Sequence, residues 1–577
     1  MRLHIRRRAL PAAECAFGPE LHPVLRRVYA SRGIRLADEL SFSLERLLPI
    51  SSLDGVEGAI ELLLRHRLAG RVLIVGDFDA DGATSTALMV RALRAWGFAG
   101  VDFLVPNRFT FGYGLTPEIV ALGAERRPTL IVTVDNGISS LAGVIAARER
   151  GIEVLVTDHH LPGATLPQAN VIVNPNVGGS GFRSRALAGV GVAFYVMAGL
   201  RHRLELQRAL PSGAPPAAHY LDLVALGTVA DLVPLDANNR VLVAQGLKRI
   251  RAGRCVPGIR ALLDVAERDR ADLSAADLAF GVAPRLNAAG RLDDMTIGIQ
   301  CLLADDPLEA VALAARLDQL NEERRAIEAR MQSEAHAAVR ALREPTLTGA
   351  RAGLCLYDGS WHQGVIGLVA SRVKDRTGRP VIAFASAADG MLRGSARSIA
   401  GLHIRDVLDA IAARHPELIQ RFGGHAMAAG LTLHPDHLDR FARAFEQEVA
   451  RAMQGACDAD CIETDGELTV QEIALDTAVA LRAGGPWGQA FPEPSFDGLF
   501  MVRSARIVGE RHLKMWLEVP HSGRSFDAIA FNHLEPASDP QSFEPELGTA
   551  RLVYRLDINE YQGERRLQLL IDHMLPA

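Results

Sequence analysis

The stretch RVLIVGDFDADG, residues 71–82, places an apolar run directly before three carboxylates. RVLIV (71–75) is apolar after its first residue and rich in branched side chains, which is typical of a strand buried on both faces. Asp77, Asp79 and Asp81 then follow at alternate positions. Like charges this close raise one another's pKa and become tolerable when a multivalent cation lies among them. The stretch therefore predicts a buried strand that ends at a metal site.

The chain around this stretch alternates short β-rich runs with amphipathic helices. Helices are predicted at 83–97 and 139–151. The other strands are predicted at VDFLV (101–105), TLIVTV (129–134), EVLVT (153–157) and VIV (171–173). Strands that alternate with helices at this spacing indicate a parallel, doubly wound α/β sheet with right-handed crossovers.

Two later strands also end on acids. Asp135 follows TLIVTV, Asp158 follows EVLVT and precedes His159 and His160, and Asp231 closes a helical stretch at 217–230. A single acid at a strand end is usually a turn or helix-cap residue, but three acidic strand ends in succession favour a metal cluster. Ligands of open parallel sheets bind outside the carboxyl ends of the strands. We expect one crevice to gather Asp77, Asp79, Asp81, Asp135, Asp158 and His159.

The donor types indicate which ion such a cluster would hold. Carboxylate with imidazole suits Mn²⁺, with Mg²⁺ as the alternative, and the six cysteines lack the spacing of a zinc site. The acids suffice for two ions about 3.5–4 Å apart, an arrangement that supports phosphoryl displacement, with Asp79 or Asp135 as the bridge. No G-x-x-x-x-G-K-[ST] motif is present, which excludes a P-loop motor.

The remaining sequence predicts further domains. Residues 303–343 form one helical pattern, and a helix of about 35 residues would extend about 50 Å. A second, smaller α/β unit follows it, and short alternating runs beyond 460 predict an antiparallel, five-stranded barrel. We divide the chain into a basic N-terminal segment (1–45), a catalytic domain (46–302), a connector helix (303–345), a substrate-binding lobe (346–460) and a barrel (461–577).

The series GDFDADG, VDNG, DHH and GTVAD, in this order, resembles the four motifs of the DHH phosphoesterase superfamily. The resemblance implies a catalytic centre in which Asp77 and His160 lie close to the metals or the scissile phosphate. Which histidine binds metal stays open. The metal ligands that the resemblance implies are Asp79, Asp81, Asp135, Asp158, His159 and Asp231.

The second lobe resembles the DHH-associated domain through WHQGVIG (361–367), ASR (370–372), GSARS (394–398) and GGH (423–425). The substrate-binding residues that this implies are His362, Ser371, Arg372, Arg397 and His425.

Three more stretches resemble the RecJ family of single-strand exonucleases within that superfamily. PNR (106–108) with FGYG (111–114) is similar to the segment that meets the 5′-terminal nucleotide, which implies roles for Arg108 and Tyr113. PRLNAAGR (284–291) is similar to a second signature. It implies substrate contacts from Arg285, Asn287 and Arg291. GPWG (485–488) with FPEP (491–494) resembles the approach to a C-terminal barrel of the OB-fold type.

The resemblance implies a metal-dependent exonuclease that degrades single-stranded DNA from 5′ to 3′ and releases 5′ mononucleotides in recombination and repair. It implies a single-strand binding protein and a RecQ-type helicase as partners, and we expect a cytoplasmic protein without a membrane segment. Two alternatives remain. One is an oligoribonuclease or cyclic-dinucleotide phosphodiesterase of the DHH superfamily, and the other is an inactive DNA-binding replication scaffold.

The charge of the barrel does not favour DNA binding. Residues 462–577 carry 10 Arg and Lys against 18 Asp and Glu, a net charge of −8, whereas residues 1–35 carry eight Arg against two Glu, a net charge of +6. DNA affinity depends on local clusters of cations rather than on such sums. The cationic strip expected on the barrel comprises Arg503, Arg506, Arg511 and Lys514.

Overall fold

The computed structural model describes residues 4–11, 15–106, 114–163, 165–179, 181–341, 352–399, 401–424, 427–453, 461–509, 511–533, 547–561 and 564–576. The chain divides into two compact units. Unit 1 comprises Met1–Arg8, Glu322–Leu475 and Ser495–Ala577, and unit 2 comprises Ala9–Asn321 and Asp476–Pro494. One boundary between the two units, at Asn321–Glu322, falls inside the long helix and matches none of the predicted domain limits. Those limits therefore stay a prediction.

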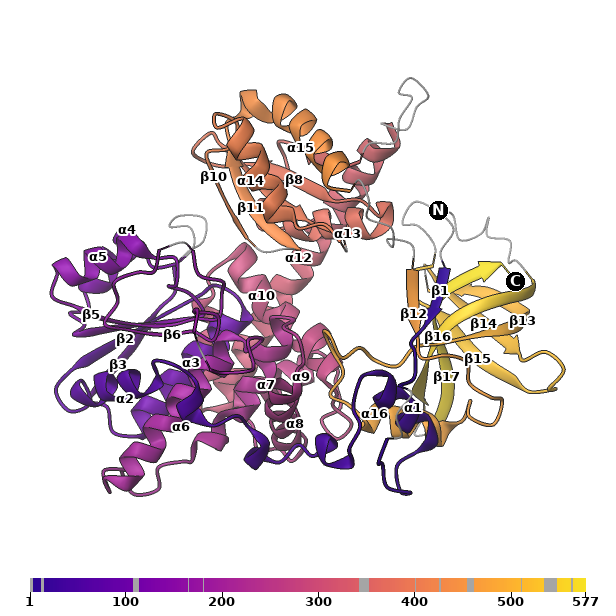
Figure 1. Cartoon of the computed structure of the whole chain (residues 1–577), viewed down its shortest axis with the longest axis horizontal. Coiled ribbons are helices and arrows are strands. Elements are labelled where there is room, and N and C mark those ends of the chain that lie inside the picture. The colour runs from indigo at the N-terminus through magenta and orange to yellow at the C-terminus, as the bar shows by residue number, and fades with distance from the viewer. Residues whose placement is uncertain are drawn as a thin grey trace. The chain divides into compact units, whose positions relative to one another are not determined.

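Unit 2 is built on a five-stranded parallel sheet in the order β3-β2-β4-β5-β6 (Figure 1). Its strands are β2 (Arg71–Gly76), β3 (Gly100–Leu104), β4 (Leu130–Val134), β5 (Glu153–Thr157) and β6 (Val171–Val173). The first strand of this sheet in chain order, β2, lies between β3 and β4, so the strand order reverses beside it. Such a switch point opens a ligand crevice at the carboxyl ends of the strands. The predicted doubly wound sheet is confirmed.

Helices cover both faces of this sheet. Figure 1 shows α4 (Pro117–Ala124) and α5 (Leu141–Glu149) on one face, with α3 (Ala80–Ala95) and α6 (Gly189–Leu206) on the other. The other helical elements of unit 2 are α1 (Pro23–Ser31), α2 (Val56–Arg65), α7 (Leu221–Ala230), α8 (Ala237–Arg251), α9 (Pro257–Val265), α10 (Ala283–Leu292), α11 (Thr296–Leu303), α16 (Leu475–Ala483, of which Leu475 belongs to unit 1), 3₁₀ turns at Ala37–Leu40, Leu44–Arg46, Ile50–Ser52 and Ala217–Tyr220, and a π-helical turn at Asp277–Val282. No helix among the described residues combines the length and apolar character that crossing a membrane would require.

The predicted long helix and second α/β lobe are also confirmed. Helix α12 (Pro307–Ala341) has 35 residues and belongs to both units. The lobe has a mixed five-stranded sheet in the order β10-β11-β9-β8-β7, in which only β7 and β8 pair in parallel. Its elements are β7 (Leu354–Tyr357), α13 (Ile366–Thr377), β8 (Val381–Ser386), β9 (Leu392–Arg397), α14 (Ile404–Arg414), β10 (Arg421–Gly424), β11 (Ala428–Leu433), a 3₁₀ turn at Pro435–His437 and α15 (Leu438–Ala452).

The predicted barrel is closed, in the order β13-β14-β15-β17-β16. Its strands are β13 (Phe496–Val508), β14 (His512–Glu518), β15 (Ser525–Ala530), β16 (Gly548–Tyr561) and β17 (Glu564–Pro576). The expectation of a wholly antiparallel barrel is wrong, because β15 and β17 pair in parallel. Strand directions cannot alternate around a ring with an odd number of members, so one parallel pair has to close it.

The basic N-terminal residues neutralise acids near the barrel. Strand β1 (His4–Arg7) pairs in parallel with β12 (Cys461–Thr464). Beside this pair, Arg7 forms an ion pair of 2.7 Å with Asp497, a carboxylate that begins β13. Two further ion pairs join Arg6 to Glu463 and Arg8 to Asp465. The opposite charges of the two ends of the chain therefore partly cancel within unit 1.

We predict that Arg7→Ala lowers the free energy of unfolding by about 1–2 kcal/mol, because it removes two hydrogen bonds to a buried charge. Both oxygens of Asp497 accept from Arg7, and its side chain is 1% exposed. Urea unfolding of the whole protein, followed through the transition of unit 1, measures the effect. Arg6→Ala is the control, since Arg6 and Glu463 are largely exposed and their pair should contribute less than about 0.5 kcal/mol. Equal losses in the two variants would contradict the assignment.

Candidate metal centre

Three acids lie between the end of β2 and the first turn of α3: Asp77, Asp79 and Asp81. Asp79 is the N-cap of α3, and its Oδ1 accepts hydrogen bonds from the N–H groups of Asp81 and Gly82, both at 3.0 Å. Asp77 lies just before it and accepts from Phe78 N–H at 2.8 Å. Capping by Asp79 uses only one carboxylate oxygen. Helix capping and metal binding by this residue are therefore compatible.

The N-terminus of α6 holds Asp81. Its Oδ2 accepts from Gly189 N–H at 2.6 Å, and its Oδ1 accepts from Val190 N–H at 2.9 Å. A helix N-terminus favours a negative charge, but burial and then the neighbouring Asp79 raise the pKa of Asp81 to about 7. Position 189 has to be glycine, because a Cβ there would lie 2.6 Å from the Cβ of Asp135.

Asp135 reaches the crevice through an unusual backbone. Its φ of 62° is left-handed, a conformation that costs energy in a residue other than glycine and is over-represented at functional sites. Asn136 stabilises this turn by donating to the carbonyl oxygens of Val75 and Val134, at the ends of β2 and β4. Burial, followed by repulsion from the acids around it, raises the pKa of Asp135 well above its usual range.

Asp158, at the end of β5, organises the two histidines. Its Oδ1 accepts from the N–H groups of His159 and His160 and bonds the His160 Nδ1 at 2.7 Å, while its Oδ2 accepts from Ile138 N–H. Burial alone would raise the pKa of Asp158, but the bond and charge of His160 outweigh it and lower that pKa. Burial likewise opposes protonation of His160, yet Asp158 raises the pKa of this imidazole to about 9.

Seven of the eight predicted centre residues come together as potential ligands. Three groups have ligand atoms within 4.8 Å of one another: Asp77 with Asp79 and Asp135, Asp81 with His159 and Asp231, and Asp135 with His159 and His160. The His159 Nε2 lies 3.1 Å from the Asp135 Oδ1 and 3.4 Å from the Asp231 Oδ2. Asp158 is in none of these groups. Metal binding by any particular residue stays a prediction.

The chemistry of these donors fits a hard divalent cation. The potential ligands are carboxylate oxygens and imidazole nitrogens, without a thiolate. Burial and then mutual repulsion also raise the pKa of Asp231 well above its usual range, as they do for Asp135. A cation would relieve that repulsion. This centre could therefore hold a divalent metal ion.

The sequence interpretation missed several residues that shape the centre. Asn174 donates to the carbonyl oxygen of His160 at 2.9 Å, and Asn176 donates to that of His159 at 2.6 Å. Their signal was present in NPN (174–176), which directly follows β6. Gly189 had no local signal, because it is required only by a side chain from another element, Asp135.

The predicted substrate contacts of unit 2 are partly used inside the fold. The Asn287 side-chain oxygen accepts from Ala80 N–H at 2.8 Å, so this residue supports the metal-site loop. Arg285 is buried, donates to the carbonyl oxygens of Gly281 and Val265, and pairs with Asp318. Arg291 is half-buried on α10, whereas Arg108 and Tyr113 lie outside the described residues. Substrate binding by these five residues stays a prediction.

The predicted contacts of unit 1 lie around α13. Arg397 donates to Ser395 Oγ at 3.0 Å, and a Cβ on Gly367 would lie 2.7 Å from its guanidinium, so the first turn of α13 abuts it. Arg372 pairs with Glu328 at 3.2 Å. Ser371 is half-buried, His362 accepts from Gly364 N–H, and His425 lies outside the described residues. Their roles toward a substrate stay predictions.

We predict that Gly290→Ala lowers activity about 10²-fold, since a displacement of about 1 Å in a catalytic site has that effect. A Cβ at position 290 on α10 would clash with the backbone carbonyl oxygen of Phe78, inside the metal-site loop. The rate of phosphodiester cleavage, the reaction that the sequence resemblance implies, measures the effect. Gly163→Ala is the control, because a Cβ there meets nothing within 4 Å. Unchanged activity of Gly290→Ala would show that the loop tolerates displacement.

Three family models match successive parts of the chain. Residues 71–228 match the DHH family N-terminal domain, residues 351–451 the DHHA1 domain, and residues 464–573 the RecJ OB domain. The first two matches, with the acidic centre at the switch point of the sheet, define the class of the chain as a DHH phosphoesterase.

Relatives and solved structures narrow this class. The chain is 54% identical over 99% of both chains to the single-stranded-DNA-specific exonuclease RecJ of Dickeya dadantii, and 52% identical over 96% of both chains to that of Escherichia coli. A crystal structure of RecJ in complex with Mn²⁺ from Thermus thermophilus matches with a TM-score of 0.81 at 30% identity, covering 100% of this chain and 80% of that one. A Mg²⁺ complex from the same organism matches with a TM-score of 0.76. The chain belongs to the RecJ family.

Proposed function

We propose that this protein is a divalent-metal-dependent exonuclease that hydrolyses single-stranded DNA. The observation that carries the proposal is the cluster of acids and imidazoles at the switch point, in a chain similar over its whole length to RecJ proteins. Those relatives are named single-stranded-DNA-specific exonucleases. The similar RecJ structures were solved in complex with Mn²⁺ or with Mg²⁺, which supports one of these two metals here.

The groups of ligand atoms suggest which residues would hold each ion and which would act on the phosphate. Asp77, Asp79 and Asp135 would hold one ion, and Asp81, His159 and Asp231 a second. When bound, two such ions would supply charge stabilisation for the phosphate and activate a water nucleophile. Asp158 would orient His160 and hold its Nδ1 proton. Asp158 raises the pKa of His160, which favours the protonated imidazole and suits it to donate to a phosphate oxygen.

The direction and setting of the reaction are part of the proposal. We propose degradation from 5′ to 3′ with release of 5′ mononucleotides, in DNA recombination and repair in the cytoplasm. A single-strand binding protein and a RecQ-type helicase are the partners proposed for it. These points rest on membership of the RecJ family, since a metal cluster by itself is indifferent to polarity and to the choice of DNA over RNA.

Product analysis tests the proposal against its alternatives. Long single strands labelled at the 5′ or the 3′ end are incubated with Mn²⁺ or Mg²⁺. We expect immediate release of the 5′ label as a mononucleotide and stepwise shortening of the 3′-labelled strand. Activity confined to oligomers of a few nucleotides would instead favour an oligoribonuclease or a cyclic-dinucleotide phosphodiesterase. Binding without cleavage under all conditions would favour an inactive scaffold.

A further inference from the structure

One segment of unit 2 carries a strongly positive charge. Residues 237–263 contain no Asp or Glu, although the whole chain has a net charge of −5. The same segment contains six cations: Arg240, Lys248, Arg249, Arg251, Arg254 and Arg260. Its local charge is therefore +6, and all of these cations except Arg240 lie within residues 248–260.

The end of α8, the loop that follows it and the start of α9 carry five cations within residues 248–260. Arg251 donates to the carbonyl oxygen of Leu273 at 2.8 Å, which ties α8 to the loop after α9. A Cβ on Gly253 would lie 3.6 Å from Arg270, so this guanidinium lies beside the loop between α8 and α9. Burial and then the buried Asp222 raise the pKa of the Cys255 thiol, and Arg260 and Arg270 oppose that rise. We call Lys248, Arg249, Arg254, Arg260, Arg270 and Arg482 the α8–α9 basic patch.

The sixth member of the patch comes from α16. Arg482 donates to the carbonyl oxygen of Asp272 at 3.2 Å. Burial lowers the pKa of Arg251, the Asp272 carboxylate opposes this, and the nearby Arg482 lowers it further. Acids also lie near these cations: Asp272 and Asp277 near Arg251, and the buried Asp222 near Arg249.

Helix stabilisation accounts for only part of the patch. Lys248, Arg249 and Arg251 occupy the last turn of α8, where cations interact favourably with the helix dipole. Arg254 lies beyond that helix, and Arg260 lies at the start of α9, where the dipole disfavours a cation. The buried Asp222 accepts from the N–H of Val256, the residue before α9, at 2.8 Å.

Three of these cations are exposed and lack a protein counter-charge. Lys248, Arg254 and Arg260 are exposed, and within the described part of the chain no carboxylate forms an ion pair with any of them. Isolated surface cations are ordinary, but several unmatched ones on one surface repel each other and attract a polyanion.

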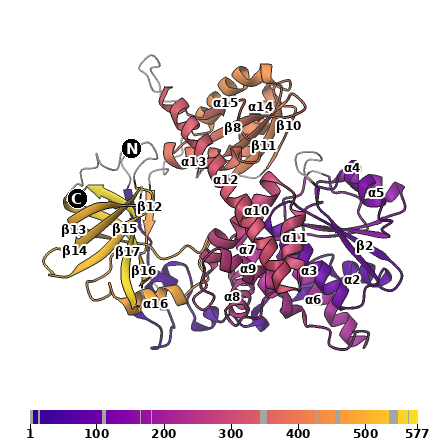
Figure 2. The ribbon, with the colours of Figure 1, turned by 180° about the vertical axis from the view of Figure 1, so that it is seen from behind.

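Helix geometry gives the distance from this patch to the metal centre. Asp231, a centre residue, directly follows α7, and α8 then runs back along α7 (Figures 1 and 2). A Cβ on Gly246 of α8 would clash with the carbonyl oxygen of Leu221 at the start of α7, so the two helices are antiparallel. The 15 residues of α8 rise about 22 Å, which places the patch about 20 Å from Asp231.

We propose that the α8–α9 basic patch binds the phosphate backbone of the single-stranded DNA substrate, at nucleotides remote from the metal centre. This inference rests on the proposed function. A stacked strand rises about 3.4 Å per nucleotide, so about six nucleotides span the distance from the centre to the patch, and an extended strand needs fewer. Strands shorter than this reach only the metal centre, whereas longer strands engage the patch as well.

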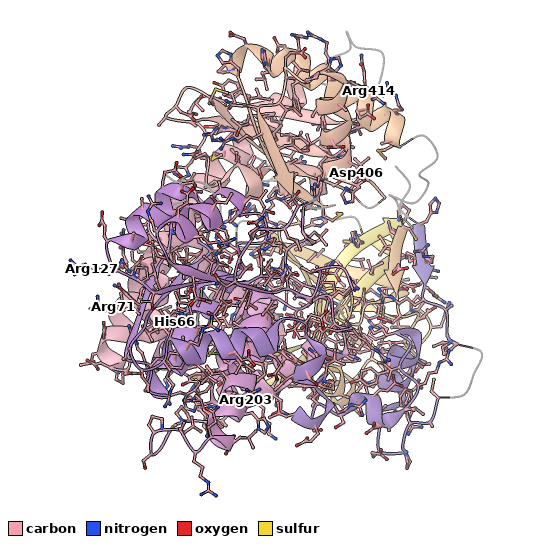
Figure 3. The ribbon with its side chains drawn as sticks, turned by 60° about the vertical axis from the view of Figure 1, so that its left-hand side comes forward. His66, Arg71, Arg127, Arg203, Asp406 and Arg414 are labelled. Carbon is pink, nitrogen blue, oxygen red and sulfur yellow. The ribbon has the colours of Figure 1, made fainter. Side chains whose placement is uncertain are left out.

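A triple variant tests the proposal, Lys248→Gln with Arg254→Gln and Arg260→Gln. Its affinity for a long single strand, measured by fluorescence anisotropy with a metal chelator present, should fall about tenfold. The slope of log affinity against log salt should become shallower by about 2, since each single-strand phosphate contact contributes about 0.7. The matched control replaces three exposed arginines elsewhere in unit 2 with Gln: Arg127 (Figure 3), Arg148 and Arg150.

Hydrolysis separates this proposal from the proposed function. The triple variant should cleave an oligomer too short to reach the patch at the rate of the unaltered protein, and cleave long strands at low concentration about tenfold more slowly. Long-strand affinity equal to that of the control would overturn the proposal, as would equal losses on short and long substrates, which indicate damage to the fold. Failure of the unaltered protein to cleave any strand would instead overturn the proposed function.

Discussion

Asp135→Asn is expected to lower the rate of strand hydrolysis by about 10³-fold, because it removes one charge from the centre of the cluster. Asp135 takes part in two of the three groups of ligand atoms. Asparagine keeps the shape of the side chain and loses most of its affinity for a hard cation. Steady-state cleavage of a labelled strand measures the effect.

The loss should occur without loss of the fold. Burial and neighbouring acids raise the pKa of Asp135, so a neutral side chain relieves repulsion and should leave the thermal stability of the metal-free protein unchanged or higher. Asp305→Asn is the matched control, since that carboxylate is 87% exposed. Hydrolysis by Asp135→Asn at the rate of the control would remove Asp135 from the catalytic centre.

Removal of divalent metal is expected to abolish hydrolysis completely. Burial and the neighbouring acids raise the pKa of Asp81 and of Asp135, and a bound divalent cation would relieve the repulsion among these carboxylates. Exhaustive chelation followed by dialysis should stop cleavage, and added Mn²⁺ or Mg²⁺ should restore it. The same additions should raise the melting temperature, because an ion that binds only the native state stabilises it. A fully active chelated enzyme would exclude a metal-dependent reaction.

Much of the catalytic unit could be predicted because its pattern is local. Apolar runs such as 71–75 mark strands buried on both faces, and parallel topology brings their carboxyl ends to one edge. The acids that follow β2 and β4 could therefore be placed together without coordinates. The five-stranded barrel followed from alternating runs, although its one parallel pair follows from ring closure and not from any run of residues.

The roles of individual residues depend on contacts that no local pattern encodes. Asp158 and Asp79 look alike as acids after strands, yet the donors around Asp158 come from Ile138, His159 and His160 and turn it toward its own loop. Asn287 lies far from β2 in the chain, and only tertiary packing brings it to Ala80. The resemblance to RecJ indicated which residues have functional roles, but it did not indicate which atoms they contact.

The central claim is that the acids and imidazoles at the switch point form a divalent-metal site. Direct titration of metal-free protein with Mn²⁺, followed by electron paramagnetic resonance or calorimetry without DNA, tests it. The unaltered protein should bind Mn²⁺, and Asp135→Asn should bind it at least about tenfold more weakly. Identical affinity and stoichiometry in the two proteins would contradict the account, because any bound ion would then lie elsewhere.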